Sequence, residues 1–211
     1  MAVTEAKFVT IEGGEGAGKT TNINFIQDYL TTAGIPFLLT REPGGTPMAE
    51  ELREMLLRHR DEAVSENCEL LLMFAARAQH IQQVIIPALK KGTWVLCDRF
   101  TDATYAYQGG GRGVDVSKIA SLENLVQGDL RPDLTLLLDV SVEVGMERAR
   151  ARGQLDRFEQ EKMDFFELVR HAYLERAKQE SNRFRVIDAA GGIDNVQQKI
   201  RNVLDRFIHE C

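Results

Sequence analysis

Near the start of the chain, one segment matches the pattern G-x-x-x-x-G-K-[ST]: Gly13-Gly14-Glu15-Gly16-Ala17-Gly18-Lys19-Thr20. An apolar run at residues 8–11 precedes it, and a helical pattern at residues 21–30 follows it. Glycines in such a loop let backbone N–H groups turn toward anionic oxygens, and the new helix directs its positive end at them. The pattern predicts an ATP-binding loop in which Lys19 reaches the β- and γ-phosphates and Thr20 binds Mg²⁺. A glycine-rich turn without a ligand is the alternative.

Apolar runs and helix-period segments alternate along the whole chain. Strands are predicted at residues 8–11, 36–40, 93–97, 134–138 and 185–187. Helices are predicted at residues 21–32, 48–58, 66–90, 116–126, 142–151, 164–180 and 193–208, with Pro87 kinking or ending the third. Strands that alternate with long helices predict an α/β fold, a five-stranded parallel sheet covered by helices on both faces, with ligands at the carboxyl ends of its strands.

The composition excludes several classes of protein. The 211 residues are 44% hydrophobic and include no linker-like tract, so they predict a single domain. A net charge of −6 argues against binding to nucleic acid or acidic membranes, which depends on an excess of Lys and Arg. Cys68, Cys97 and Cys211 form no C-x-x-C pair, so we expect reduced thiols in the cytoplasm. Neither a signal peptide nor a membrane span is expected.

Charged residues follow two of the predicted strands directly. Asp98 and Arg99 come after the strand at 93–97, where a phosphate-binding loop fold places a metal-facing carboxylate. Asp98 has the alternative of capping the next helix, whereas Arg99 suits a second phosphate. Arg41 follows the strand at 36–40 in a loop shaped by Gly and Pro, and its alternative is a surface ion pair with Glu42 or another acid.

Two further segments carry candidate functional residues. Phe74 and Arg77 share one face of the predicted helix 66–90, where a ring and a guanidinium can meet a base, although Phe74 also suits the core. His80 is expected at the surface or in packing. The run Gly109-Gly110-Gly111-Arg112-Gly113 is expected to be the most flexible stretch, a surface turn being its alternative.

Arginines are concentrated in the last third of this acidic chain. Arg148, Arg150, Arg152 and Arg157 lie within ten residues, and Gly153 interrupts them. A solvated helix face explains this density poorly. We expect a lid at about residues 148–160 that closes over phosphates and spreads the charge of a transition state.

Several motifs together resemble the bacterial thymidylate kinases, the nucleoside monophosphate kinases that phosphorylate dTMP. They are Ile11-Glu12-Gly13, Arg41-Glu42-Pro43-Gly44-Gly45-Thr46, Ala75-Ala76-Arg77, Asp98-Arg99, Ala106-Tyr107-Gln108-Gly109-Gly110-Gly111-Arg112-Gly113, Arg131-Pro132-Asp133-Leu134-Thr135 and Leu155-Asp156-Arg157-Phe158-Glu159. The phosphate-binding loop alone would indicate only a superfamily. The series spans most of the chain and is far more specific.

The resemblance implies roles for residues that contact the sugar and phosphate of dTMP. Glu15 holds the deoxyribose 3′-hydroxyl, and Arg41 and Arg99 bind the dTMP phosphate. Tyr107 lies where the family excludes a ribose 2′-hydroxyl. Gly16 replaces an arginine that one branch of the family carries in the loop, so this chain resembles the branch whose lid supplies that charge, with Arg152 and Arg157 as catalytic residues beside Lys19 and Arg99.

The resemblance also implies how the base is bound. Arg77 faces a thymine carbonyl, and Thr104 and Gln108 lie near the base edge. The family usually stacks the base on a Phe four residues before the helix Arg, where this chain has Met73. Phe74, one residue later, is the expected stacking residue, although either side chain could cover the ring.

The expected reaction is Mg²⁺-dependent transfer of a phosphoryl group from ATP to dTMP, carried out by a homodimer. The reaction needs alignment and charge neutralisation rather than covalent chemistry from the protein. A GTPase-type switch predicts an N-K-x-D motif, which this sequence lacks. Another small-molecule kinase with the same loop is the remaining alternative, because it would not require Glu15, Arg77, Tyr107 and Gln108 together.

Overall fold

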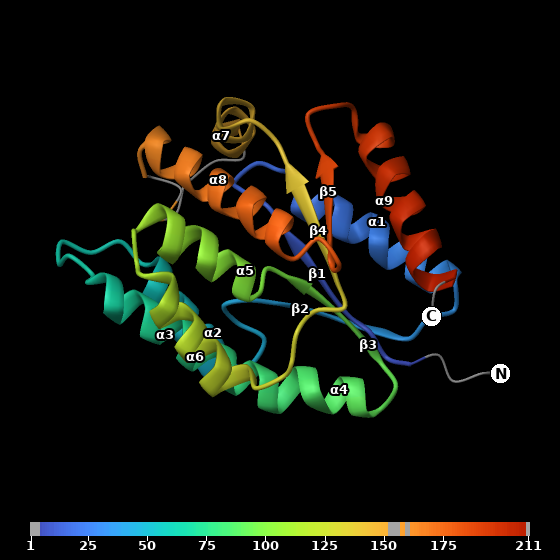
Figure 1. Cartoon of the computed structure of the whole chain (residues 1–211), viewed down its shortest axis with the longest axis horizontal. Helices are drawn as coiled ribbons and strands as arrows, with labels where there is room; N and C mark the ends of the chain where they lie inside the picture. The colour runs from blue at the N-terminus through green and yellow to red at the C-terminus, as the bar shows by residue number, and fades with distance from the viewer. Residues whose placement is uncertain (1–4, 152–156, 159–160, 210–211) are drawn as a thin grey trace.

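A five-stranded, wholly parallel sheet forms the centre of the molecule (Figure 1). The computed structural model describes residues 5–151, 157–158 and 161–209. The strands are β1 (Phe8–Glu12), β2 (Phe37–Arg41), β3 (Trp94–Asp98), β4 (Leu134–Asp139) and β5 (Phe184–Asp188). Their order is β2-β3-β1-β4-β5, so the strand that leads into the glycine-rich loop lies in the middle. The predicted strands and fold class are confirmed.

Helices cover both faces of the sheet. In Figure 1, α1 (Lys19–Thr32) and α9 (Ile193–His209) lie on one side. The other side carries α3 (Glu66–His80), α4 (Ile86–Lys90), α5 (Thr101–Thr104), α6 (Val116–Gln127) and α8 (Met163–Gln179). The remaining α-helices in the described chain are α2 (Pro47–Leu57) and α7 (Val142–Ala151). None of the described helices has the length and apolarity that crossing a membrane requires.

Two π-helical stretches extend these helices. The first, η1 (Ile81–Ile85), joins α3 to α4 directly before Pro87. Proline lacks an N–H, and its ring crowds the carbonyl four residues back, so a local widening lets the helix continue through Pro87 rather than end there. The second, η2 (Tyr105–Gly111), continues α5.

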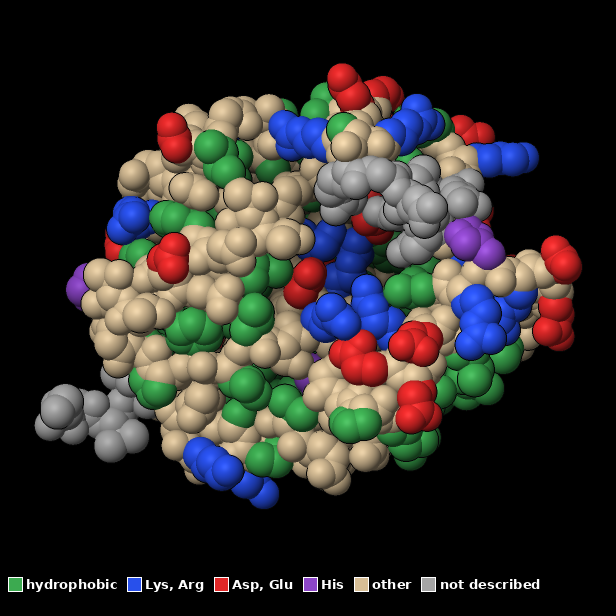
Figure 2. Space-filling view, turned by 180° about the vertical axis from the view of Figure 1, so that it is seen from behind, with side chains coloured by type: hydrophobic (Ala, Val, Ile, Leu, Met, Phe, Trp, Pro, Cys, Tyr) green, Lys and Arg blue, Asp and Glu red, His purple; other side chains and the backbone are tan. Residues whose placement is uncertain are grey.

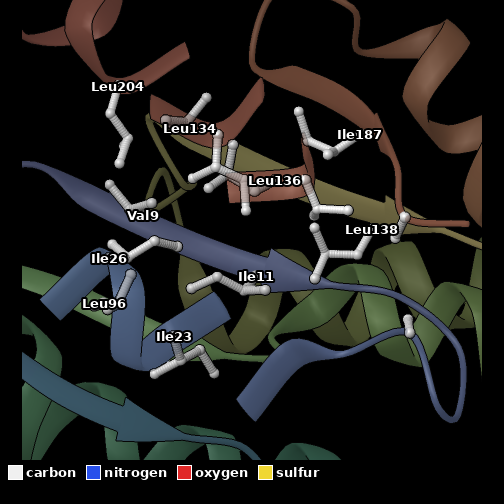
Figure 3. Packing of buried hydrophobic residues seen from close by; sticks show 14 of the residues in the cluster. Val9, Ile11, Ile23, Ile26, Leu96, Leu134, Leu136, Leu138, Ile187 and Leu204 are labelled. Carbon is white, nitrogen blue, oxygen red and sulfur yellow. The ribbon is translucent and has the colours of Figure 1, made fainter. Parts of the chain in front are cut away.

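Successive side chains of the strands point to opposite faces of the sheet, so the buried apolar residues form separate clusters on the two faces. Val9 and Ile11 in β1 face α1 and α9 and pack with residues such as Ile26 (Figure 3). Phe8 faces the opposite side and packs with Val95. Because successive side chains of a strand point to opposite faces, a buried central strand must be apolar at almost every position.

The predicted flexibility of the Gly109–Gly111 region is wrong, because these residues form part of η2, which packs closely on α8. A Cβ on Gly110 would lie 2.6 Å from the Cβ of Ala172, and one on Gly111 would lie 2.4 Å from the Phe165 ring. The glycines therefore permit close helix contact rather than an unusual backbone conformation.

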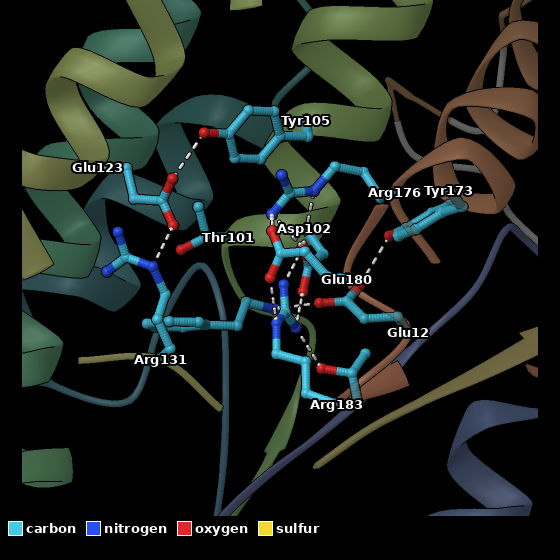
Figure 4. A network of polar contacts seen from close by, with 12 residues as sticks. Glu12, Thr101, Asp102, Tyr105, Glu123, Arg131, Tyr173, Arg176, Glu180 and Arg183 are labelled. Carbon is cyan, nitrogen blue, oxygen red and sulfur yellow. Dashed lines mark hydrogen bonds and ion pairs between the residues drawn. The ribbon is translucent and has the colours of Figure 1, made fainter. Parts of the chain in front are cut away.

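A buried polar network joins α5 to α8 and to β4 (Figure 4). The Asp102 carboxylate is 1% exposed and accepts from Arg176 Nη2 at 3.0 Å and Arg183 Nη1 at 2.7 Å. Arg183 Nη1 also donates to Thr135 Oγ1 in β4 at 2.7 Å. Since truncating one partner of a buried ion pair is costly, this network fixes the helices that carry the site described next.

Candidate active site

The glycine-rich loop connects β1 to α1 and wraps around the amine of Lys19. Lys19 Nζ donates to the carbonyl oxygens of Gly13 and Gly14, each at 3.0 Å. Burial lowers the pKa of this amine from 10.5 to about 8. Gly16 has a φ of 65° and lies against Gly145 of α7, so the loop and α7 are in backbone contact.

A cavity of about 670 Å³ opens beside this loop at the carboxyl ends of the strands. Figure 2 shows Lys and Arg side chains gathered around a hollow on one face of the molecule. Most predicted site residues line the cavity: Glu15, Gly16, Ala17, Gly18, Lys19, Thr20, Arg77, Asp98, Arg99, Thr104, Tyr107 and Gln108. A volume of this size holds a small molecule, as expected at the carboxyl edge of a parallel sheet.

Glu15, Arg99 and Tyr107 form a connected cluster in the cavity wall. Arg99 Nη2 donates to Glu15 Oε1 at 2.8 Å, and the Tyr107 hydroxyl donates to the same oxygen at 2.6 Å. Burial raises the pKa of the Tyr107 phenol, which keeps it a donor. Arg99 Nη1 also donates to the Tyr173 hydroxyl at 3.3 Å, which in turn donates to Glu12 Oε2 at 2.8 Å. The cluster therefore presents a fixed cation and a fixed ring to the cavity.

Arg77 offers a free donor in another part of the wall. Its Nε donates to Glu42 Oε2 at 2.7 Å and its Nη2 to Thr104 Oγ1 at 3.1 Å. Among the described residues, its buried Nη1 has no hydrogen-bond partner. His80 is fully buried and donates from Nδ1 to Glu42 Oε1 at 2.9 Å, so it has a packing role. An unpaired buried guanidinium nitrogen is costly unless a ligand, such as a carbonyl oxygen, accepts from it.

Asp98 and Thr20 line the same cavity and suit a hard cation. Asp98 Oδ1 is buried and, within the part of the chain that the structure describes, has no hydrogen-bond partner. The helix that follows it, α5, has Phe100 at its N-cap position, so capping does not explain Asp98. Within the described ranges no group of three or more His, Cys, Asp or Glu side chains could hold a metal. Mg²⁺ is commonly held by few protein groups together with substrate phosphates, and the two residues fit that arrangement.

Arg41 does not line the cavity, although it was predicted to bind the acceptor phosphate. It is an exposed residue and forms an ion pair with Glu50 at 2.9 Å, in agreement with the surface alternative. Arg53 in α2 lines the cavity instead, and its Nη1 donates to the Pro43 carbonyl at 2.9 Å. No sequence pattern indicates Arg53, because an isolated arginine on an amphipathic helix usually faces solvent.

Phe74 is a core residue, which corrects its predicted role in base stacking. It is 2% exposed and packs with Leu70 and Ile119, and the Arg77 guanidinium lies 4.8 Å from its ring centroid. Met73 lines the cavity in its place. Met73, which stands where the family usually has the stacking Phe, therefore faces the cavity.

Of the four arginines predicted in the lid segment, one lies at the cavity. Arg148 lines the cavity and donates to the Ala189 carbonyl at 3.2 Å. Arg150 is exposed, and Arg152 lies outside the described residues. Arg157 is not brought into the cavity, since its Nη2 donates to Glu69 Oε2 at 2.6 Å.

Comparison with known proteins identifies the family. The thymidylate kinase family model matches residues 11–200. The chain belongs to the thymidylate kinase family. It is 58% identical over 204 residues to the thymidylate kinase of Pseudomonas putida (strain W619), covering 97% of this chain and 99% of the relative. It is 59% identical to that of Ectopseudomonas mendocina (strain ymp), covering 97% of both chains.

A solved structure supports the same assignment. The crystal structure of thymidylate kinase from Ehrlichia chaffeensis superposes with a TM-score of 0.78 at 32% sequence identity. The match covers 95% of this chain and all of that chain. The family resemblance that the sequence motifs indicated is therefore confirmed.

Proposed function

We propose that this thymidylate kinase family member transfers the γ-phosphoryl group of ATP to dTMP, forming dTDP for the biosynthesis of dTTP. The observation that carries the proposal is that one cavity joins the phosphate-binding loop to the Glu15, Arg99 and Tyr107 cluster and to the donor of Arg77 that has no partner among the described residues. In this proposal the loop side of the cavity binds the triphosphate of ATP, and the side with the cluster and Arg77 binds the deoxynucleotide. A kinase for a different small molecule would not need all three of these acceptor-side features.

The proposed mechanism depends on alignment and charge. The acceptor phosphate of dTMP is already an oxyanion, so no general base is required. Arg99, held by Glu15, positions that phosphate, and Lys19 neutralises charge on the transferring group. In this proposal the Tyr107 ring would exclude a ribose 2′-hydroxyl, and the Glu15 carboxylate would accept from the sugar 3′-hydroxyl; both residues line the cavity.

Thr20 and Asp98 would hold Mg²⁺ in this proposal. Mg²⁺ held by these residues would neutralise negative charge on the ATP phosphates. The unpaired buried Oδ1 of Asp98 supports this assignment. The hydroxyl of Thr20 lies at the start of α1, where the loop motif places a metal-binding Ser or Thr.

We further propose one kinase domain over residues 1–211, with a lid at about residues 148–160. Closure of the lid would exclude water, whose attack on ATP would waste the phosphoryl group. Arg152 and Arg157 would then supply the cation that Gly16 leaves out of the loop. Arg157 must exchange its pairing with Glu69 for phosphate contacts during closure.

A panel of acceptors tests the proposed reaction. Purified protein with labelled ATP and Mg²⁺ should phosphorylate dTMP far faster than other nucleoside monophosphates or small alcohols. Lys19→Ala should remove the activity and leave the thermal midpoint nearly unchanged, because the amine acts on phosphate charge rather than on the core. A preference for an acceptor other than dTMP would support the alternative of a different small-molecule kinase.

The protein is proposed to act as a homodimer in the cytoplasm without nucleic acid or membrane. Leu71 in α3 is 56% exposed and Leu125 in the neighbouring α6 is 80% exposed, which is apolar surface suited to a second copy. Cys68 and Cys97 are free thiols, as a reducing compartment favours. Sedimentation should show twice the 23.8 kDa of one chain. A monomer at micromolar concentration would contradict the dimer.

A further inference from the structure

Glu69 is a buried carboxylate that receives three donors from outside its own helix. It lies in α3 and is 1% exposed. Its Oε1 accepts from Gln108 Nε2 at 2.9 Å and from Arg112 Nε at 3.4 Å, and its Oε2 accepts from Arg157 Nη2 at 2.6 Å. Glu69 does not line the cavity. Glu69 can therefore influence a ligand only through the side chains to which it is hydrogen-bonded.

The pairing fixes the orientation of the Gln108 amide. A carboxylate offers acceptors and no donor, and Glu69 is paired with two guanidinium cations. Gln108 must consequently present its NH₂ group to Glu69. Its Oε1 has no hydrogen-bond partner among the described residues, and the side chain lines the cavity. The Gln108 amide could otherwise present either its oxygen or its NH₂ group to the cavity. The bond to Glu69 leaves Oε1 available to accept from a ligand.

A free donor lies nearby on the same wall. Thr104 and Gln108 are four residues apart in the continuous helix of α5 and η2, so they share a face. Thr104 Oγ1 accepts from Arg77 Nη2, while Arg77 Nη1 is buried and has no partner in the described chain. The wall thus offers one donor and one acceptor. The donor can bond to a ring carbonyl of a base, and the acceptor can bond to the adjacent ring N–H.

We propose that Glu69 is a positioning residue that determines which pyrimidine the site accepts, an inference that rests on the proposed function. Thymine and uracil carry an N3–H beside the O4 carbonyl, and these groups pair with Gln108 Oε1 and Arg77 Nη1. Cytosine carries an unprotonated N3 beside a 4-amino group, so an acceptor would meet an acceptor and a donor would meet a donor. Glu69 enforces the first half of this discrimination by preventing rotation of the Gln108 amide.

A double-mutant cycle tests this role. Glu69→Leu frees the amide to present its NH₂ to cytosine N3, so the ratio of kcat/KM for dTMP over dCMP should fall roughly tenfold or more. The ratio for dTMP over dUMP should stay constant, because both bases carry N3–H and O4. Adding Glu69→Leu to Gln108→Ala should change the dTMP over dCMP ratio no further, since Glu69 acts through Gln108. Glu69→Gln retains an acceptor oxygen and should lower the ratio less.

Glu123→Gln is a matched control, because Glu123 is also a buried carboxylate, bonded to Tyr105 and Arg131 away from the cavity. It should alter stability without altering the base preference. Calorimetric binding of dTMP and dCMP supplies a second readout that does not need turnover. If the wild type binds dTMP selectively but transfers no phosphoryl group, the proposed function fails while the cycle still decides the role of Glu69. An unchanged preference in both folded Glu69 variants, or full additivity with Gln108→Ala, would overturn the inference.

Discussion

Gly145, in α7, lies against the backbone of the phosphate-binding loop. A Cβ added at position 145 would lie 2.4 Å from the carbonyl oxygen of Glu15. The reverse contact is closer still, since a Cβ on Gly16 would lie 1.8 Å from the Gly145 carbonyl oxygen. Gly16→Arg, which would imitate the other family branch, is therefore not accommodated unless α7 moves. Gly145→Ala is the milder perturbation.

The size of the effect follows from these distances. Ordinary contact begins at 3.4 Å, so the loop and α7 must separate by about 1 Å to admit the methyl group of Gly145→Ala. Alanine is favoured over glycine in a helix by about 1 kcal/mol, whereas overpacking costs about 1–3 kcal/mol. The free energy of unfolding should therefore fall by less than about 2 kcal/mol. A displacement of about 1 Å near reacting groups can lower the rate about 100-fold, so kcat/KM should fall far more than stability does.

Steady-state kinetics with dTMP and ATP, together with urea unfolding, measure both quantities. Gly192→Ala is the control, because a Cβ added at Gly192 would have no atom of the described residues within 4 Å, and Gly192 does not have a left-handed φ. It should leave kcat and KM unchanged. If Gly145→Ala keeps parental kinetics and raises stability by the full helix preference, the contact between α7 and the loop does not constrain catalysis.

Four further outcomes are expected. Tyr107→Ala should narrow the kcat/KM gap between deoxy and ribo acceptors, and an equal ratio before and after would show that the sugar is read elsewhere. Met73→Ala should raise KM for dTMP with little change in thermal midpoint, whereas a large drop in midpoint would indicate a core role. Arg152→Ala and Arg157→Ala should each lower kcat more than they raise KM for dTMP, and parental kcat in both would refute the lid. Burial raises the pKa of Glu12 from 4.5 to about 8, so its proton stabilises the fold below pH 4.5 and this contribution is lost by pH 8. Urea unfolding should show stability falling by up to about 1.4 kcal/mol per pH unit in that window relative to Glu12→Gln, and parallel profiles would contradict the shift.

The strands and the loop could be predicted because their signals are local. The strands are mostly apolar and the loop motif lies between a strand and a helix, so the sequence predicts Lys19 and Asp98 at the edge of the sheet where the structure has them. The carboxyl ends of parallel strands converge, which brings Asp98 and Arg99 to the loop without any further information.

Errors occurred where the direction of one side chain decides its role. Successive residues of a helix differ by about 100° in direction, so Phe74 enters the core while Met73 enters the cavity. Arg41 follows a predicted strand but lies at the surface, where it pairs with Glu50, and Arg53 of α2 lines the cavity instead. The role of Gly110 depends on its contact with α8, which lies far away in the sequence, so no local pattern indicates it.

The order of the strands has a consequence for synthesis of the chain on the ribosome. Val9 in the central strand lies opposite Leu96 of β3 and Leu134 of β4, and both partners emerge long after it. Until Leu134 has emerged, one edge of β1 has no partner and its apolar side chains lack much of their cover. The phosphate-binding loop is thus the first functional element to be translated, yet it becomes competent only when two thirds of the chain is available. Nascent chains that stall before β4 should expose this strand and be substrates for chaperones rather than for nucleotides.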